Sequence, residues 1–166
     1  MPVVDFIREF ARAEQRPPVA FALADYQAAG TRRPAILAPA PGRLTWTLPI
    51  PRRGVFRTQI APAASVGARV RVGVSDARIY EGLAAVDVRP DSGWVPVTVD
   101  LSAYAGWKVS LFYRPERQAW HVNVSVDAIG GAPSRVALGA PEIVTDRPGA
   151  AEYAKRRARL TRSEAP

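Results

Sequence analysis

The sequence has no cysteine among its 166 residues, so disulfide bonds, thiolate catalysis and cysteine-based zinc sites are excluded. It has one histidine, too few for the usual transition-metal sites. Acidic residues are in the minority, with 15 against 23 lysines and arginines and a net charge of +8. Such a charge favours anionic partners. The basic residues are not interleaved with aromatic residues as in nucleic-acid binders, so we do not expect nucleic acid to be the partner.

Long apolar runs are also missing. No stretch approaches the roughly 20 residues that cross a bilayer as a helix. The first 15 residues carry acidic side chains and lack the apolar core of a secretory signal. We therefore expect a soluble or peripheral protein, whose compartment the sequence does not assign. A chain of this length fits one domain that buries about 70% of its unfolded surface.

Residues 94–113 show the clearest pattern in the chain. Val95, Val97 and Val99 point to one face and Trp94, Pro96, Thr98 and Asp100 to the other, which predicts a half-buried strand. The sequence DLSAYAG then interrupts the alternation, since Asp100 has a short side chain that bonds nearby backbone N–H groups and Gly106 tolerates positive φ. Alternation resumes over residues 107–113. We predict two strands joined by a single helical turn or tight loop, forming an antiparallel pair.

Further strands follow from the same period of two. The predicted strands are residues 43–50, 55–61, 68–75, 79–88, 120–128 and 135–144. Their spacing is typical of an all-β sandwich, and no helices of the length that a parallel sheet needs lie between them. Glycines and prolines in residues 27–42 indicate an irregular connection with at most a short strand at residues 35–37.

The two ends of the chain differ from this β-rich middle. Val3, Ile7 and Phe10 recur at helical spacing, which predicts an amphipathic helix over residues 3–14 that covers the edge of the sandwich or docks a partner. A second helix, rich in arginine, is expected after Pro148. The predicted organisation is an N-terminal helix in residues 1–16, a β-sandwich in residues 17–145 and a basic helical tail in residues 146–166.

Several of these stretches resemble a known family. The core motif from Trp94 through DLSAYAG, RRPAILAPAPGRLTWTLPIP at residues 32–51, ARVRVGV, and LGAPEIV at residues 138–144 occur in order. Together they resemble the galactose-binding-like jelly-roll modules attached to bacterial sulfatases, glycosidases and uncharacterised extracellular proteins. The resemblance implies an antiparallel jelly-roll β-sandwich over roughly residues 19–145, and it favours a strand over residues 19–26. Leu138 stands where such modules often carry an aromatic residue.

One polar strand face is the best candidate for chemistry. His121, Asn123, Ser125 and Asp127 alternate with inward residues of one strand. Side chains two apart on a strand lie about 6.6–7 Å apart, which exceeds a hydrogen bond, so they cannot form a Ser-His-Asp arrangement among themselves. No Gly-x-Ser-x-Gly motif is present. We expect no catalysis, and this face is either an ordinary solvent face or a surface that binds sugar or protein.

A sugar site needs an aromatic side chain beside hydrogen-bonding groups. Trp46, Trp107 and Trp120 align with inward residues of their strands, whereas Trp94 lies opposite its valines. The candidate glycan-binding residues are Trp94, His121, Asn123 and Asp127. No cofactor is expected. Because modules of the resembled kind often hold a structural ion, the resemblance leaves calcium open, with Asp76, Asp87, Asp91 and Asp100 near turns.

The basic tail gives the leading functional hypothesis. Its cations are Lys155, Arg156, Arg157, Arg159 and Arg162. Together with Phe6 and Phe10 of the N-terminal helix, they are the candidate partner-binding residues. We expect a non-catalytic interaction module, an accessory or scaffolding subunit that docks on a larger protein assembly, with an anionic membrane surface as one setting. The alternative is a carbohydrate-binding module of a sulfatase or glycosidase system.

Overall fold

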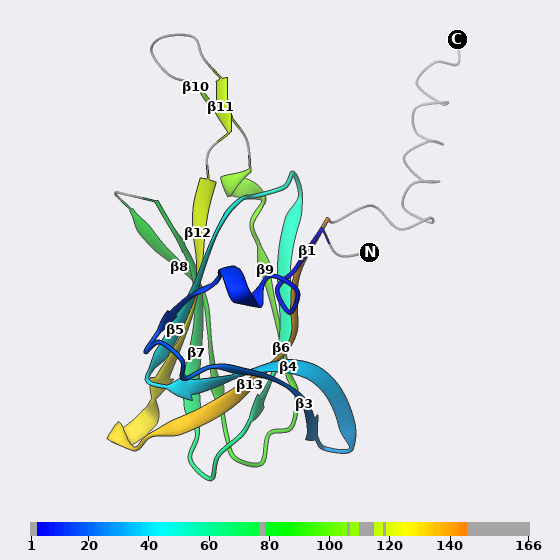
Figure 1. The fold of residues 1–166 in the computed structure, drawn as a ribbon, viewed down its shortest axis with the longest axis vertical. Coiled ribbons are helices and arrows are strands. Elements are labelled where there is room, and N and C mark those ends of the chain that lie inside the picture. The colour runs from blue at the N-terminus through cyan, green and yellow to red at the C-terminus, as the bar shows by residue number, and fades with distance from the viewer. Residues whose placement is uncertain (1–2, 77–78, 106, 110–114, 118, 146–166) are drawn as a thin grey trace, which may run out of the picture.

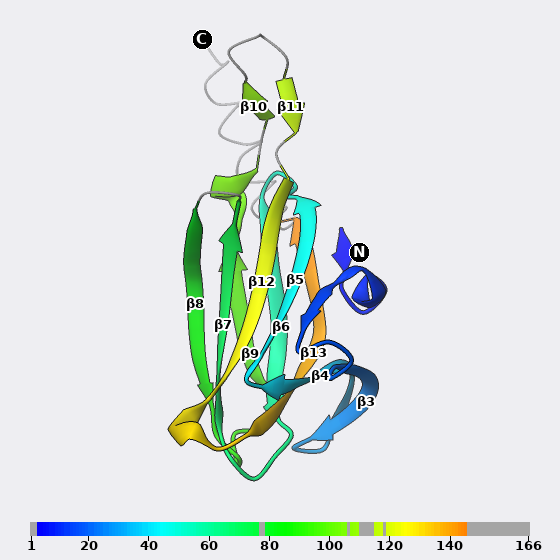
Figure 2. The same cartoon turned by 60° about the vertical axis from the view of Figure 1, so that its left-hand side comes forward.

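The computed structural model describes residues 3–76, 79–105, 107–109, 115–117 and 119–145. Two antiparallel sheets face each other and form a sandwich (Figures 1 and 2). Sheet A has the order β3 (Ala22–Ala28), β4 (Thr31–Ala40), β13 (Ser134–Thr145), β6 (Gly54–Pro62) and β9 (Val95–Asp100), with β1 (Val4–Asp5) also on β13. Sheet B has the order β2 (Glu14–Arg16), β5 (Gly42–Pro49), β12 (Ala119–Ala128), β7 (Ala68–Ser75) and β8 (Tyr80–Val88).

Short elements complete the fold. A hairpin of β10 (Trp107–Val109) and β11 (Pro115–Arg117) extends beyond one end of the sandwich (Figure 1). Three single 3-10 turns are η1 (Phe10–Arg12), η2 (Ser102–Tyr104) and η3 (Ile129–Gly131). None of the described helical segments is long and apolar enough to cross a membrane.

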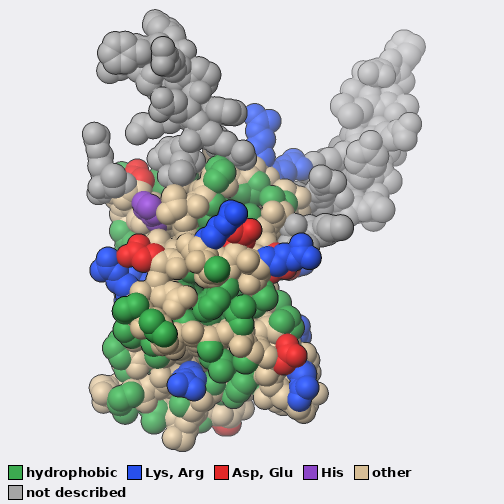
Figure 3. All heavy atoms as spheres, viewed as in Figure 1, with side chains coloured by type: hydrophobic (Ala, Val, Ile, Leu, Met, Phe, Trp, Pro, Cys, Tyr) green, Lys and Arg blue, Asp and Glu red, His purple; other side chains and the backbone are tan. Residues whose placement is uncertain are grey.

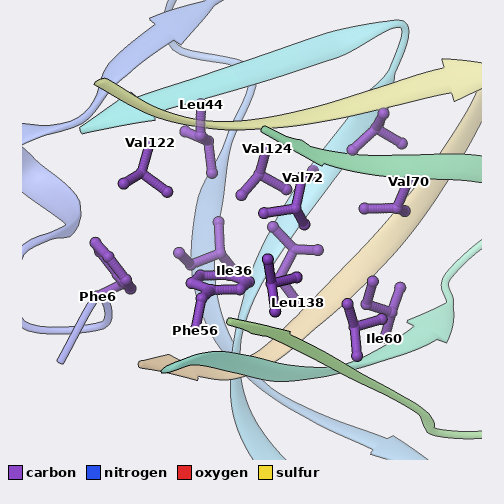
Figure 4. Packing of buried hydrophobic residues seen from close by; sticks show 14 of the residues in the cluster. Phe6, Ile36, Leu44, Phe56, Ile60, Val70, Val72, Val122, Val124 and Leu138 are labelled. Carbon is purple, nitrogen blue, oxygen red and sulfur yellow. The ribbon is translucent and has the colours of Figure 1, made fainter. Parts of the chain in front are cut away.

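The core lies between the sheets and follows the alternation in the sequence. In sheet B, the even-numbered residues of β5, β7 and β12, such as Leu44, Val72 and Val124, are buried or half-buried. They point at Phe56, Leu138 and other apolar residues of sheet A (Figure 4). Because the side chains of a strand alternate between its two faces, the odd-numbered residues of the same three strands face outward. The predicted antiparallel all-β sandwich is confirmed.

The predicted N-terminal helix is wrong. Residues 3–14 instead form β1, a single turn and η1. This segment passes from sheet A, where β1 pairs with β13, to sheet B, where β2 pairs with β5. The Asp5 carboxylate accepts hydrogen bonds from the N–H groups of Ile7 and Arg8, while Phe6 N–H bonds Pro141 O. These contacts and the burial of Phe6 outweigh a marginal helical periodicity. Residues 3–16 therefore do not form a separate helical element, since β1 and β2 belong to the sheets.

The irregular connection predicted over residues 27–42 is also wrong. Ala29 and Gly30, with φ of 50° and 81°, form a tight turn between β3 and the ten-residue strand β4. Positive φ at both central residues matches the twist of a hairpin. Pro39 is tolerated because it lies beyond Leu37, the last β4 residue that is paired with β3. The preceding strand begins at Ala22 rather than at residue 19.

The turn predicted after residue 99 is confirmed as η2, and the Asp100 carboxylate accepts the Ser102 N–H (2.9 Å) as expected. The predicted pairing of the two flanking strands is wrong. β9 pairs with β6, and β10 pairs with β11, because η2 directs the chain out of sheet A. Of the second predicted strand only Trp107–Val109 is described. The predicted basic helix of residues 146–166 lies outside the described residues.

Phe6 closes the core on the side where the N-terminal segment crosses it. Its ring is fully buried and lies 4.5 Å from Trp46 of sheet B and 5.8 Å from Phe56 of sheet A, measured between ring centroids. Trp46 Nε1 also donates to Glu9 O (3.1 Å). The N-terminal segment is thereby joined to both sheets.

Phe6→Ala is expected to lower the free energy of unfolding by about 3–5 kcal/mol, because it removes a fully buried ring between the sheets. Val3→Ala, in the same segment but with a half-exposed side chain, should change it by less than about 0.5 kcal/mol. Urea unfolding followed by tryptophan fluorescence measures both. Similar small changes in the two variants would contradict the structural role of Phe6.

Candidate functional site

The outward face of sheet B brings together polar side chains from three neighbouring strands. β12 lies between β5 and β7, and its register sets His121 opposite Thr47 and Ser75. In the next row, Asn123 lies opposite Thr45. Opposed residues on neighbouring strands have Cβ atoms about 4.5–5.5 Å apart, so these side chains lie within contact of one another.

Asn123 is the centre of a hydrogen-bond network on this face. Its Nδ2 donates to Ser75 Oγ (2.9 Å), and its Oδ1 accepts from Thr45 Oγ1 (2.8 Å). The residue is only 4% exposed, and a buried amide without partners costs about 1–3 kcal/mol. The network also orients two hydroxyls. Ser75 keeps its proton for a further acceptor, and Thr45 keeps lone pairs for a further donor.

His121 joins the site, whereas Asp127 does not. His121 Nδ1 lies 2.8 Å from Thr47 Oγ1 in a hydrogen bond. The Asp127 carboxylate instead pairs with Arg71, with 2.7 Å between Oδ2 and Nε. The histidine therefore has a hydroxyl partner but no carboxylate partner among the described side chains, so a Ser-His-Asp triad is not formed there.

Tyr80 supplies the aromatic side chain of this face, and it is not among the residues predicted from the sequence. Its ring lies over Gly73 of β7, where a Cβ atom would come within 2.9 Å of the tyrosine Cζ. The residue is 51% exposed. Gly73 interrupts the alternating valines of its strand, and glycine inside a strand often marks close approach of another group. This was the available signal.

The first residues of β8 are held in place by hydrogen bonds on both sides of Tyr80. Ile79 N–H donates to Asp76 Oδ1 (2.7 Å), and Asp76 N–H donates to Ile79 O (2.9 Å). On the other side, the Tyr104 hydroxyl donates to the Glu81 carboxylate. The residues on either side of Tyr80 are thus held by Asp76 and by Tyr104 of η2.

These side chains line a shallow depression of about 370 Å³, which we call the polar trough. Its lining residues are Glu14, Arg16, Arg43, Thr45, Ser75, Tyr80, His121 and Asn123. They come from all five strands of sheet B. The trough combines one exposed aromatic ring, oriented hydroxyls, an imidazole and charged groups at one end.

A larger hollow of about 660 Å³ lies between the N-terminal segment and β5. Its aromatic rings, Phe6 and Trp46, are buried in the core. Its acids are already engaged, since Asp5 accepts backbone N–H groups and Glu9 pairs with Arg12 (3.2 Å). This hollow is larger than the polar trough but offers no exposed ring and few unengaged polar groups.

Trp94 lies away from the polar trough. It faces outward as the sequence predicts, but from sheet A, where it contacts Gly139 and meets Tyr26 edge-on with 6.1 Å between ring centroids. The Arg33 guanidinium lies 5.7 Å from the centroid of its ring. Its Nε1 donates to Thr31 O (2.9 Å). The structure therefore separates Trp94 from His121 and Asn123, with which the sequence analysis grouped it.

The aspartates considered for calcium are dispersed. Asp87 pairs with Arg69 (2.7 Å), and Asp100 accepts the Ser102 N–H. Asp91 is exposed in a separate turn. Within the described ranges, no three histidine, aspartate or glutamate side chains are grouped to hold a metal ion.

The candidate partner-binding residues fall into two groups. Phe6 is fully buried and Phe10 half-buried against the core, so the Phe6 ring is a core residue rather than a surface contact. Lys155, Arg156, Arg157, Arg159 and Arg162 lie outside the described residues. Figure 3 shows that cations on one face are scattered, several of them beside acidic side chains.

No protein-family model matches the sequence, and no curated protein matches it. Solved structures do match. The carbohydrate-binding module TmCBM61, solved with beta-1,4-galactotriose, aligns over 81% of this chain and 88% of the module with a TM-score of 0.53 and 12% identity. The fold is a galactose-binding-like jelly roll.

Two further structures share the jelly-roll fold. An exo-beta-agarase aligns with a TM-score of 0.59 and 9% identity over 89% of this chain, which spans 25% of the agarase chain. The K2 cleaved adhesin domain of Lys-gingipain aligns with a TM-score of 0.51 and 11% identity over 81% of this chain and 91% of the domain. At these identities the likeness shows the fold and carries no function across.

The pKa of Tyr104 provides a test of its hydrogen bond to Glu81. Burial, and then the hydrogen bond to the Glu81 carboxylate and its charge, raise the pKa of Tyr104 to about 12. Because this lies above the value of about 10 in an unfolded chain, the neutral hydroxyl stabilises the fold below pH 10. This contribution is lost as the pH rises from about 10 to 12.

In an absorbance titration of the phenolate, Tyr104→Phe should remove the transition near pH 12, whereas Tyr80→Phe should leave it in place. Glu81→Gln should move that transition to lower pH, because the negative charge that opposes ionisation is gone. A transition near pH 12 that is unchanged in Tyr104→Phe would refute the assignment.

Proposed function

We propose that this protein is a non-catalytic carbohydrate-binding module and that the polar trough is its binding site. The observation that carries the proposal is the half-exposed Tyr80 ring beside the network centred on Asn123. A sugar ring has apolar C–H faces and a rim of hydroxyls, so it needs an aromatic surface and hydrogen-bonding groups together. The trough provides both on one face of one sheet.

The hydrogen-bonding groups of the trough suit sugar hydroxyls because each hydroxyl is both a donor and an acceptor. Ser75, whose oxygen accepts from Asn123, presents a donor, and Thr45, whose proton is used by Asn123, presents an acceptor. His121, which lies opposite Ser75 on the neighbouring strand, adds an imidazole to the lining of the trough. Groups held by their neighbours lose little entropy when a ligand binds.

The position of the trough also supports binding rather than catalysis. Its residues lie on strands, which hold side chains more rigidly than loops do. The one described histidine–hydroxyl pair lacks a carboxylate partner, as described above. Carbohydrate-binding modules and the β-sandwich domains of glycoside hydrolases are among the solved structures that share the fold, which supports the same proposal.

The comparisons favour this function over the accessory-subunit hypothesis. That hypothesis rests mainly on the basic segment after residue 146, which lies outside the described residues, and on Phe6, whose ring is buried. A docking role for the basic segment remains a separate proposal, tested by whether deletion of residues 147–166 abolishes binding to a partner assembly.

Tyr80→Ala is expected to weaken glycan binding by about 10-fold or more, because the apolar face of the sugar loses its aromatic contact. Tyr80→Phe keeps the ring and should retain most of the affinity. Affinity electrophoresis in β-1,4-galactan, xylan and agarose, together with a glycan array, identifies a bound polysaccharide, and calorimetry then measures the affinities.

Ile79→Ala is the matched control, since Ile79 is 62% exposed, adjacent in sequence and outside the trough lining. It should bind like the wild type, and all variants should unfold at the same temperature as the wild type. Binding of no glycan at all, or equal binding by Tyr80→Ala and the wild type, would overturn the proposal.

A further inference from the structure

Arg43 is the cation of the polar trough that has no acidic partner among the described residues. It lies on β5, exposed, and it lines the trough two residues from Thr45. Its cross-strand neighbour on β12 is Ser125, a neutral side chain. Nothing on the described part of this face therefore neutralises its charge.

The neighbour of Arg43 on the other side is another arginine. The register of β2 and β5 sets Arg16 directly opposite Arg43, and both side chains line the trough. Like charges directly opposite each other on paired strands destabilise a sheet. The nearby acid, Glu14, is already used, because its Oε1 lies 3.0 Å from both Nε and Nη2 of Arg16.

The other acids on the face are engaged as well. Asp127 pairs with Arg71 and Asp87 with Arg69, each with 2.7 Å between nitrogen and oxygen. These pairs neutralise the arginines of β7, so Arg43 is the arginine of this face that has no acidic partner among the described residues. The unpaired cation thus lies at the end of the trough next to β2, at the opposite end from Tyr80.

We propose that the polar trough selects an anionic glycan, one whose sugar carries a carboxylate or a sulfate group, and that Arg43 binds this group. The inference rests on the proposed glycan-binding function and specifies its ligand class. An anion at this position relieves the repulsion between Arg43 and Arg16. The planar guanidinium donates two parallel N–H bonds to carboxylate or sulfate oxygens.

The spacing of the strands fits such a ligand. A row of residues paired across the sheet begins at Gly73, beneath the Tyr80 ring, and continues through Asn123 and Thr45 to Glu14 of β2. The row therefore spans three interstrand steps. This row is roughly 14 Å long at about 4.8 Å per step, the span of a short oligosaccharide. A sugar ring stacked on Tyr80 therefore leaves its chain to continue over the Asn123 network toward the arginine pair.

The test compares polymers that differ in charge while sharing a backbone. Polygalacturonate and its methyl ester form one pair, and a sulfated galactan and its desulfated form make the other. The wild type is expected to bind at least one anionic member about 10-fold more tightly than its neutral counterpart. The pair that shows the preference identifies the carboxylate or the sulfate as the group bound.

Arg43→Gln should remove this preference, so that the anionic polymer binds no more tightly than its neutral counterpart. Arg135→Gln is the matched control, because it removes the same charge from an exposed position on sheet A and tests attraction by net charge alone. It should lower the affinity by less than about 2-fold at moderate salt.

Two results would overturn the inference while leaving the proposed function standing. One is equal, Tyr80-dependent binding of the neutral and anionic polymers by the wild type. The other is an anionic preference that Arg43→Gln retains, or that Arg135→Gln loses to the same extent. If no glycan binds, neither these polymers nor those of the array, the proposed function itself fails, whereas binding of neutral glycans alone overturns only the inference.

Discussion

The register of β12 between β5 and β7 determines both faces of sheet B. Val122 and Val124 are buried because they lie opposite the inward residues of both neighbours. Since strand side chains alternate, the same register sets Asn123 beside the hydroxyls with which it bonds. A slip of one residue would expose the valines and bury an unpartnered amide and imidazole, so the packing of the core also selects the arrangement of the trough.

The outward face of sheet B shows how polar groups are tolerated on a strand surface. Asn123 is nearly buried and needs both hydroxyl partners, and the cations of β7 each have an acid. Within this satisfied surface, two features provide no evident gain in stability: the exposed ring of Tyr80, which lies over Gly73, and the apposed arginines Arg16 and Arg43. Departures from local consistency are expected at functional sites, and both departures lie in the polar trough.

The sequence predicted the strands with strong alternation and the outward direction of His121 and Asn123, because a period of two depends only on local geometry. It did not predict the N-terminal segment or β4. There, long-range contacts decide the structure, since Phe6 is held between the two sheets and β4 pairs with β13. The aromatic residue of the site was missed for the same reason, since the position of Tyr80 over Gly73 depends on the pairing of β7 with β8.

Trp94 shows why an outward aromatic residue is a weaker indicator of a glycan site than its surroundings. Its ring has Gly139 beside it and the Arg33 guanidinium nearby, and its N–H is bonded to Thr31 O. Tyr80 keeps half of its surface in water and has oriented hydroxyls nearby. Because a shallow trough leaves one side of a bound glycan in solvent, a few pre-organised contacts must provide most of the affinity. The side chains best placed to do so are those that the fold holds in position without covering, and in sheet B they converge on Asn123.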